Sequence, residues 1–272
     1  MAMNTRRRLL QAIAGLVGAS VSKTWAADEQ TLNRNRDGFL RALFTSFDNS
    51  DAEITLAPPV GDASCILTQE QTEGPFFLTA PLRRDITEGK PGLPLDLAIQ
   101  IVAADGCTPV AGVLVEVWHC DASGQYSGHP DTSRSIYSTL EYLQWDGGAR
   151  RVPAINEDLW FRGAQQTNND GIVQFKTIFP GWYDMRAPHI HFKIGGQNRE
   201  LFTSQFYFDE ATASRIYRRH SDYSAYGESP YSVANDMVVQ NSGGAKGLLL
   251  ATAAVEAGME ASARVGINLP PG

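Results

Sequence analysis

His189-Ile190-His191-Phe192-Lys193-Ile194 is the stretch of sequence that decides the fold. Apolar and polar side chains alternate along it with a period of two, which predicts a β-strand that packs on one side. The apolar residues between Ile190 and Ile194 form one face, and His189 and His191 share the other. Side chains two apart on a strand point the same way and stand roughly 7 Å from each other, so both imidazoles can bind one metal ion.

Two histidines on a strand also occur as ordinary polar residues on a solvated face. The chain has only five histidines in 272 residues, and two of the five lie in this tripeptide. A metal site needs further ligands, so the choice between the two interpretations depends on residues elsewhere in the chain.

The amino terminus combines Arg6-Arg7-Arg8 with a weakly apolar run over residues 12–21 and small residues near Ala26. This pattern predicts a twin-arginine export signal over residues 1–26, although a basic amphipathic helix of the fold is an alternative. The apolar run is shorter than the roughly 20 residues that span a bilayer, so we expect no stable membrane anchor. The protein is therefore expected to be exported, either periplasmic or extracellular.

The net charge of −7 makes the chain acidic, and the export signal contributes basic residues but no acidic ones. An acidic surface repels phosphate backbones and anionic headgroups, so we expect neither nucleic acid nor anionic membrane as a partner. With 272 residues and 43% apolar composition, the chain can bury a substantial core of one or two domains.

Three cysteines, Cys65, Cys107 and Cys120, permit one disulfide with one thiol left over. Cys65 and Cys107 lie at turn-like positions, whereas Cys120 ends an apolar stretch, so the first two form the favoured pair. Three free thiols are the alternative. In an oxidising compartment, the disulfide would stabilise the fold by roughly 4 kcal/mol in the chain-entropy model.

Beyond the leader, residues 27–63 are predicted to form a helix and a linker. Apolar side chains between Phe39 and Phe47 recur at helical spacing, which suits packing or a contact in a homo-oligomer.

From residue 64 the apolar residues recur with a period of two, over residues 95–102, 113–117, 172–179 and 259–267. Asn169-Asp170-Gly171 is predicted to be a hairpin turn. Many short strands separated by Gly and Pro predict an all-β domain over residues 64–272, a β-sandwich of mainly antiparallel strands.

Two tyrosines follow turn signals and supply the missing ligand types. Val115–Cys120 is an apolar strand that ends in a turn just before Tyr126, and Pro180-Gly181-Trp182 precedes Tyr183. Two phenols with two imidazoles suit Fe(III), because phenolate oxygen favours a highly charged cation. A phenol of pKa about 10 ionises at neutral pH only beside such a charge, whereas zinc sites normally use Cys, His and carboxylate.

Several separated motifs together resemble the intradiol ring-cleavage dioxygenases, the family of catechol 1,2-dioxygenase and protocatechuate 3,4-dioxygenase. The resemblance covers roughly residues 65–240. Its motifs are Thr72-Glu73-Gly74-Pro75-Phe76-Phe77, Val117-Trp118-His119-Cys120-Asp121 with Tyr126, Phe161-Arg162-Gly163, Pro180-Gly181-Trp182-Tyr183 with His189 and His191, and Ser204-Gln205-Phe206-Tyr207-Phe208.

By position, the resemblance implies that Fe(III) is the cofactor and that its four ligands are Tyr126, Tyr183, His189 and His191. It also implies catalytic roles for Tyr183, Arg186 and Gln205. Tyr183 matches the tyrosinate that the substrate displaces, Arg186 matches a cation beside the substrate ring, and Gln205 matches a glutamine near that ring. The implied reaction inserts both atoms of O2 into a catechol and gives a cis,cis-muconate-type diacid.

Other polar and aromatic residues receive secondary predictions. His119 is expected to make a structural hydrogen bond, His129 to line the pocket and His220 to be solvated. Tyr137, Tyr142 and Trp160 are expected at the entrance. The short stretch between Tyr183 and His189 favours an open active-site mouth.

Two alternative functions remain open from the sequence. One is a non-catalytic β-sandwich that binds small aromatics or carbohydrate. The other is a zinc hydrolase that uses His189 and His191.

Overall fold

The computed structural model describes residues 65–129, 135, 139–141, 143–146, 149–196 and 199–269. The predicted export signal over residues 1–26 and the predicted helix and linker over residues 27–63 lie outside the described residues and stay predictions. The same holds for Tyr137 and Tyr142. In the part of the chain that is described, no helix is both long enough and apolar enough to span a membrane.

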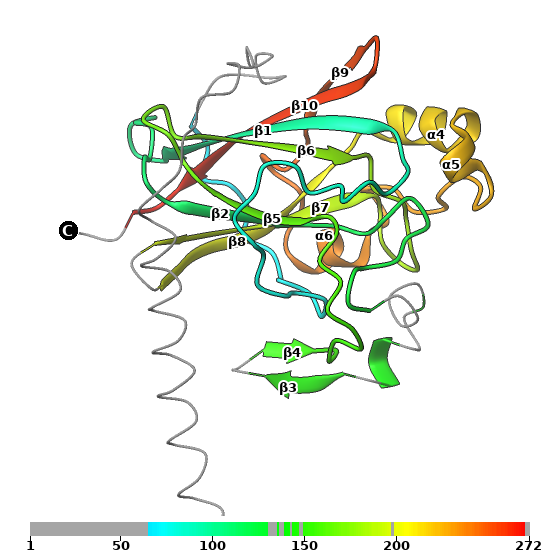
Figure 1. Ribbon diagram of the computed structural model, residues 1–272. Helices are drawn as coiled ribbons and strands as arrows, with labels where there is room; N and C mark the ends of the chain where they lie inside the picture. The colour runs from blue at the N-terminus through cyan, green and yellow to red at the C-terminus, as the bar shows by residue number, and fades with distance from the viewer. Residues whose placement is uncertain are drawn as a thin grey trace, which may run out of the picture. The chain divides into compact units, whose positions relative to one another are not determined.

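Two four-stranded sheets organise the described residues (Figure 1). The first sheet has the order β6 (Ile172–Ile178), β1 (Pro94–Ala103), β10 (Gly258–Ile267) and β9 (Ala251–Val255). The second has the order β5 (Arg162–Gln166), β2 (Leu114–Trp118), β7 (His189–Gly196) and β8 (Arg199–Tyr207). A two-stranded ribbon pairs β3 (Gln144–Asp146) with β4 (Ala149–Arg151).

Every strand pair in the two sheets is antiparallel except β1 with β10, which run parallel. Apolar side chains of both sheets meet in one core, to which β1 contributes Leu97 and Ile99 and β7 contributes Ile190 and Phe192. All four of these side chains are fully buried. The predicted all-β sandwich of mainly antiparallel strands is confirmed. The apolar face of β7 lies in the core, as the alternation of apolar and polar residues predicted.

The turn before β6 differs from the sequence prediction. Gly171 N–H donates to Asn168 O at 3.0 Å, and Ile172 N–H donates to the Asn168 side chain at 2.8 Å, so the chain does reverse there. The strands on either side, β5 and β6, nevertheless lie in different sheets. The prediction of a hairpin was therefore wrong: turn residues report that the chain reverses, but not which sheet receives the next strand.

Three short helices in the described residues begin at side chains that accept backbone hydrogen bonds. They are α4 (Glu210–Arg219), α5 (Ser221–Ser224) and α6 (Met237–Asn241), capped by Asp209, His220 and Asp236 respectively. Such caps satisfy the free N–H groups of a first helical turn. His220 is thus only partly exposed and caps α5, so the expectation of a simply solvated histidine was incomplete.

The predicted disulfide is confirmed. Cys65 and Cys107 are bonded, with their Cα atoms 5.3 Å apart, and they join the first described residues to the loop after β1. Cys120 is free and buried, and its thiol donates to Gly181 O at 3.4 Å. Burial raises the pKa of this thiol, which keeps it protonated and unreactive.

Candidate metal centre

His189 and His191 begin β7 and point to the same side of the second sheet. His191 pairs in register with Trp118 of β2 and with Gln205 of β8, so the centre of the sheet fixes its backbone. The two Nε2 atoms lie 3.1 Å apart. The structure therefore places the two imidazoles together on the polar face of the strand.

Tyr126 reaches the same point through a tight turn after β2. Asp121 builds this turn, since its Oδ1 accepts hydrogen bonds from Ser123 N at 2.8 Å and Gln125 N at 3.0 Å. Phe76 stacks on the Tyr126 ring, with centroids 4.9 Å apart. The Tyr126 phenol is fully buried, and the turn and the stacked Phe76 ring hold it in place.

Tyr183 is delivered by a second tight turn, which leads into β7. Arg186 N–H donates to Tyr183 O at 3.1 Å, and Met185 adopts a positive φ of 64° to close the turn. The turn folds the phenol back, so that Tyr183 Oη lies 3.1 Å from His189 Nε2.

Four donor atoms consequently converge. Tyr126 Oη lies 3.3 Å from His189 Nε2 and 3.5 Å from Tyr183 Oη, and the two imidazole nitrogens complete the group. Separations near 3 Å are those expected of atoms that share one cation at coordination distances of about 2 Å. Sequence prediction and geometry thus select the same four side chains.

The protonation states expected for these four side chains suit the binding of a highly charged cation. Burial lowers the pKa of both His189 and His191 well below the usual value, so both imidazoles are neutral donors. His189 Nδ1 lies 2.6 Å from Ala187 O, which favours a proton on Nδ1 and leaves the Nε2 lone pair facing the centre. Burial raises the pKa of Tyr183 to about 12 and also raises the pKa of Tyr126 well above its usual value, so the phenols ionise only beside a strong positive charge.

The donor set is also distinct from that of ordinary zinc sites. Across the described ranges, no group of three or more His, Cys, Asp or Glu side chains is placed to hold a metal ion. The gathered ligands are two phenols and two imidazoles, a set that suits Fe(III) better than Zn²⁺.

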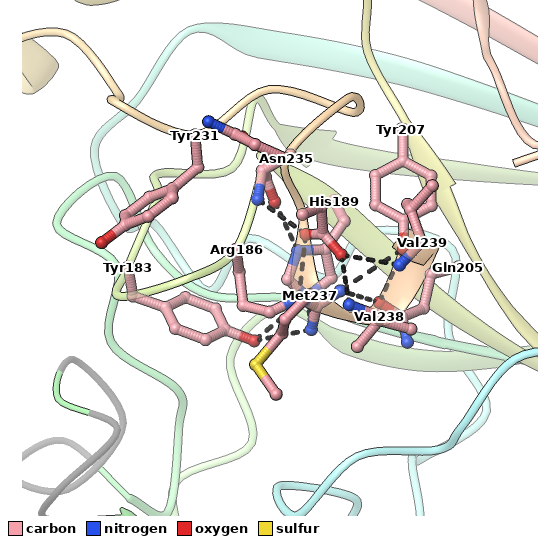
Figure 2. A network of polar contacts seen from close by, with 12 residues as sticks. Tyr183, Arg186, His189, Gln205, Tyr207, Tyr231, Asn235, Met237, Val238 and Val239 are labelled. Atoms are coloured by element: carbon pink, nitrogen blue, oxygen red, sulfur yellow. Dashed lines mark hydrogen bonds and ion pairs between the residues drawn. The ribbon is translucent and has the colours of Figure 1, made fainter. Parts of the chain in front are cut away.

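Arg186 lies beside the centre and is buried (Figure 2). Its Nη1 is 3.4 Å from Tyr183 Oη, and its Nη2 donates to Gln205 Oε1. Its Nε forms an ion pair with Asp236 at 3.0 Å. Burial disfavours the charge of Arg186, but Tyr183 and Asp236 outweigh this cost and raise its pKa, so it is a permanent cation.

Gln205 holds this arginine from β8. Its amide nitrogen donates to Thr72 O at 2.9 Å, which leaves its oxygen facing Arg186. Tyr207, two residues along the same strand face, lies 3.4 Å from Arg186 Nη2 and donates to Gln71 Oε1 at 2.9 Å. The structure therefore brings all the predicted site residues into one connected network.

A pocket of about 570 Å³ opens beside Tyr183 and Arg186. Its walls come from residues 72–76, from Thr139, Leu140 and Leu143, and from the start of α6, which contributes Met237 and Val238. The walls are largely apolar, and the Tyr183 phenol and the Arg186 guanidinium are among the polar groups that line them. Such a cavity suits an aromatic ligand that carries polar groups.

The segment Thr72–Phe77 covers His191 and is held by charges that the sequence analysis missed. Gly74 has a φ of 76°, and a Cβ there would lie 3.2 Å from His191 Cε1. The neighbouring Glu73 forms ion pairs with Arg151, at 2.6 Å, and with Lys193. Lys193 lies on the same face of β7 as His189 and His191. Its position on this polar face was the one sequence feature from which a role for Lys193 near the site could have been predicted.

Three secondary predictions can be compared with the structure. His119 makes the expected structural hydrogen bonds, to Thr177 Oγ1 at 2.6 Å and Cys120 O at 2.8 Å. His129 does not line the pocket, because it is buried between the carbonyls of Ser127 and Val152. Trp160 is not at an entrance either, since it packs in the core against Phe161. For both residues, closeness in sequence to a predicted site motif did not predict a position at the pocket.

Comparison with known proteins agrees with the fold. A family model described as dioxygenase matches residues 73–216, which is more than half of the chain. The solved structure of an intradiol ring-cleavage dioxygenase from Tetranychus urticae is similar with a TM-score of 0.66 and 28% identity, covering 75% of this chain and 95% of that one. The chain belongs to the intradiol ring-cleavage dioxygenase family.

Two curated relatives are similar over part of their length. Catechol 1,2-dioxygenase 1 of Acinetobacter lwoffii is 26% identical over 163 residues, 51% of this chain and 45% of that protein. A chlorocatechol 1,2-dioxygenase of Cupriavidus pinatubonensis is 28% identical over 142 residues, 50% of this chain and 53% of that protein. The chain spans about half the length of these curated relatives.

Proposed function

We propose that this protein is an Fe(III)-dependent intradiol dioxygenase, which inserts both atoms of O2 into a catechol-type aromatic to give a cis,cis-muconate-type diacid. The observation that carries the proposal is the convergence of Tyr126, Tyr183 and His191 on His189, whose Nε2 lies 3.1–3.3 Å from a donor atom of each, beside the aromatic-sized pocket. Membership of the family supports the reaction class.

In this proposal, the two phenols and the two imidazoles hold the metal. Bound Fe(III) supplies a strong positive charge that ionises phenolic groups and draws electron density from a bound diphenolate. The protein keeps both imidazoles neutral by burial, so no proton competes for the lone pairs. It also excludes water from the ligands, because all four side chains are buried.

Tyr183 is the ligand that faces the substrate. Of the four proposed ligands, it alone lines the pocket, and Arg186 Nη1 lies 3.4 Å from its oxygen. An ionised Tyr183 Oη would therefore be placed to accept a proton from a catechol hydroxyl. The raised pKa of Tyr183, which is about 12 because of burial, would favour holding that proton.

Arg186 and the pocket walls act on the substrate ring. A fixed guanidinium in the pocket wall stabilises negative charge that develops on the bound aromatic, and Gln205 holds the guanidinium in place. Apolar groups such as Val238 and Leu143 hold the ring and keep water out.

The test is to load the protein with iron and to follow three readouts together. We expect one iron per chain, a visible charge-transfer band from tyrosinate bound to Fe(III), and O2 uptake with catechol, protocatechuate, hydroxyquinol or larger diphenols. Mass analysis of the product should show the substrate plus two oxygen atoms. Aromatic binding without colour or O2 uptake would support a non-catalytic module, and bound zinc with hydrolysis would support the zinc alternative.

We also propose that the protein is exported. The disulfide between Cys65 and Cys107 supports this, since such bonds persist mainly in oxidising compartments. The test is cell fractionation of the full chain beside a variant with Arg6→Lys and Arg7→Lys. Export of the first and retention of the second are expected, whereas equal retention of both would contradict the proposal.

A further inference from the structure

Asp236 is a buried carboxylate whose two oxygens have different partners. Oδ2 accepts hydrogen bonds from Arg186 Nε at 3.0 Å and from Ala187 N at 2.8 Å. Oδ1 accepts from Val238 N at 2.8 Å and from Val239 N at 3.0 Å. The side chain is fully buried, and four donors satisfy it.

The two oxygens connect two parts of the site. The Oδ1 bonds start α6, whose first residues, Met237 and Val238, form a wall of the pocket. The Oδ2 bonds hold the guanidinium of Arg186 and the peptide that follows it. Figure 2 draws Met237 and Val238 in the same network of polar contacts as Arg186. One carboxylate thus ties an apolar wall of the pocket to its cation.

Arg186 needs such an anchor, because a free arginine side chain has many rotamers and its charge is costly to bury. In the described part of the chain, Asp236 is the only carboxylate within ion-pair distance of Arg186. Because Asp236 binds the Nε edge, the two Nη atoms are left to face Tyr183 and Gln205. The geometry of the ion pair therefore determines which edge of the guanidinium meets the substrate.

We infer that Asp236 is a positioning residue, which sets the orientation of Arg186 and fixes it relative to the pocket wall at Met237 and Val238. The inference rests on the proposed function for its catalytic consequence. Asp236 itself does not line the pocket, so it acts through Arg186.

The test compares Asp236→Asn with the matched variant Asp209→Asn. Asp209 also caps a helix, accepting from Thr212 N at 2.9 Å, but it is exposed and does not line the pocket. A misplaced catalytic group costs up to about 10²-fold in rate, so Asp236→Asn should lower kcat by about 10- to 100-fold. Asp209→Asn should leave kcat and KM unchanged. Equal kcat in Asp236→Asn and the wild type would overturn the inference.

A second readout is independent of iron and of turnover. The Nε–H signal of Arg186 in a ¹H–¹⁵N spectrum, assigned by its loss in Arg186→Lys, should be protected from exchange in the wild type. It should move or exchange rapidly in Asp236→Asn and stay in place in Asp209→Asn. An unmoved signal in Asp236→Asn would overturn the inference even if catalysis were impaired. If instead the wild type showed no O2 uptake, the proposed function would fail, and this spectrum would still decide the role of Asp236.

A double-variant cycle separates positioning from simple destabilisation. If Asp236 acts through Arg186, Asp236→Asn should have little further effect on kcat in an Arg186→Lys background. Fully additive losses would contradict the inference. Should Asp236→Asn fail to fold, Asp236→Glu keeps the charge but displaces the arginine. It should lower kcat in a protein that remains folded, and a wild-type kcat would count against the inference.

Discussion

The indole of Trp118 stacks on the imidazole of His191, with ring centroids 4.9 Å apart and an angle of 6° between their planes. Imidazole ligands are usually oriented by a hydrogen bond to the nitrogen that does not bind the metal. His191 Nδ1 has no such partner among the described residues. The stacked Trp118 indole therefore orients the His191 imidazole in place of a hydrogen bond.

Replacing Trp118 by Ala should accordingly release the ring as well as leave a cavity. We expect a loss of about 3–5 kcal/mol in the free energy of unfolding, from the cavity, together with weaker iron retention. Trp118→Phe keeps an aromatic face and should retain iron. Urea unfolding and iron analysis after dialysis measure both effects, and full iron retention in Trp118→Ala would contradict the role given to the stack.

Replacing the proposed tyrosine ligands and replacing the proposed histidine ligands should have different effects on the visible band, turnover and iron content. Tyr126→Phe or Tyr183→Phe should shift or bleach the visible band and lower turnover, because each removes one tyrosinate. His189→Ala should lose iron. His220→Asn, which changes a histidine that caps α5, is the control and should keep both iron and colour. If a variant of His189 or His191 kept full iron and full activity, the ligand assignment would be wrong.

The buried His119 should make stability depend on pH. Burial lowers its pKa to about 4 in the folded state, against the usual 6.5, so only the unfolded chain binds a proton between these values. The stabilisation is therefore complete above pH 6.5 and is lost as the pH falls toward 4. For this one group the loss between pH 7.5 and pH 5 is about 2 kcal/mol.

The measurement is the free energy of unfolding of the iron-free protein at both pH values, for the wild type and for His119→Gln. A glutamine cannot take up the proton, so the difference between pH 7.5 and pH 5 should shrink by about 2 kcal/mol in the variant. An identical pH dependence in both proteins would show that His119 does not contribute.

Reduction of the disulfide should weaken the domain. Closing the loop between Cys65 and Cys107, which are 42 residues apart in sequence, stabilises the fold by about 4 kcal/mol in the chain-entropy model. A Cys65→Ala, Cys107→Ala variant should therefore unfold at lower urea concentration, and added dithiothreitol should bring the wild type to the same midpoint. No change on reduction would mean that the bond adds no stability.

Local pattern was enough to predict strands β1, β2, β6, β7 and β10, and the face of β7 that carries both imidazoles. The alternation from His189 to Ile194 gave the strand, the buried face and the pair of imidazoles. Tyr126 and Tyr183 followed turn residues that could be recognised one by one. These features depend on neighbours in sequence, which explains why they could be predicted without the structure.

The missed features depend on contacts between distant segments. Asp236 looks like an ordinary helix cap in the sequence, and its ion pair is with Arg186, 50 residues earlier. Glu73 reaches Lys193 across 120 residues. The Asn168–Gly171 turn was recognised, but the change of sheet after it is decided by the packing of the whole sandwich. Such pairings follow from topology, which no local pattern contains.

The parallel pairing of β10 with β1 has a consequence for biosynthesis. Because β10 lies between β1 and β9, the first sheet stays split until residues 258–267 have left the ribosome. Contacts between segments so far apart also form slowly. The sandwich should therefore close only after β10 has been added, and chains that lack residues 258–267 should stay sensitive to protease.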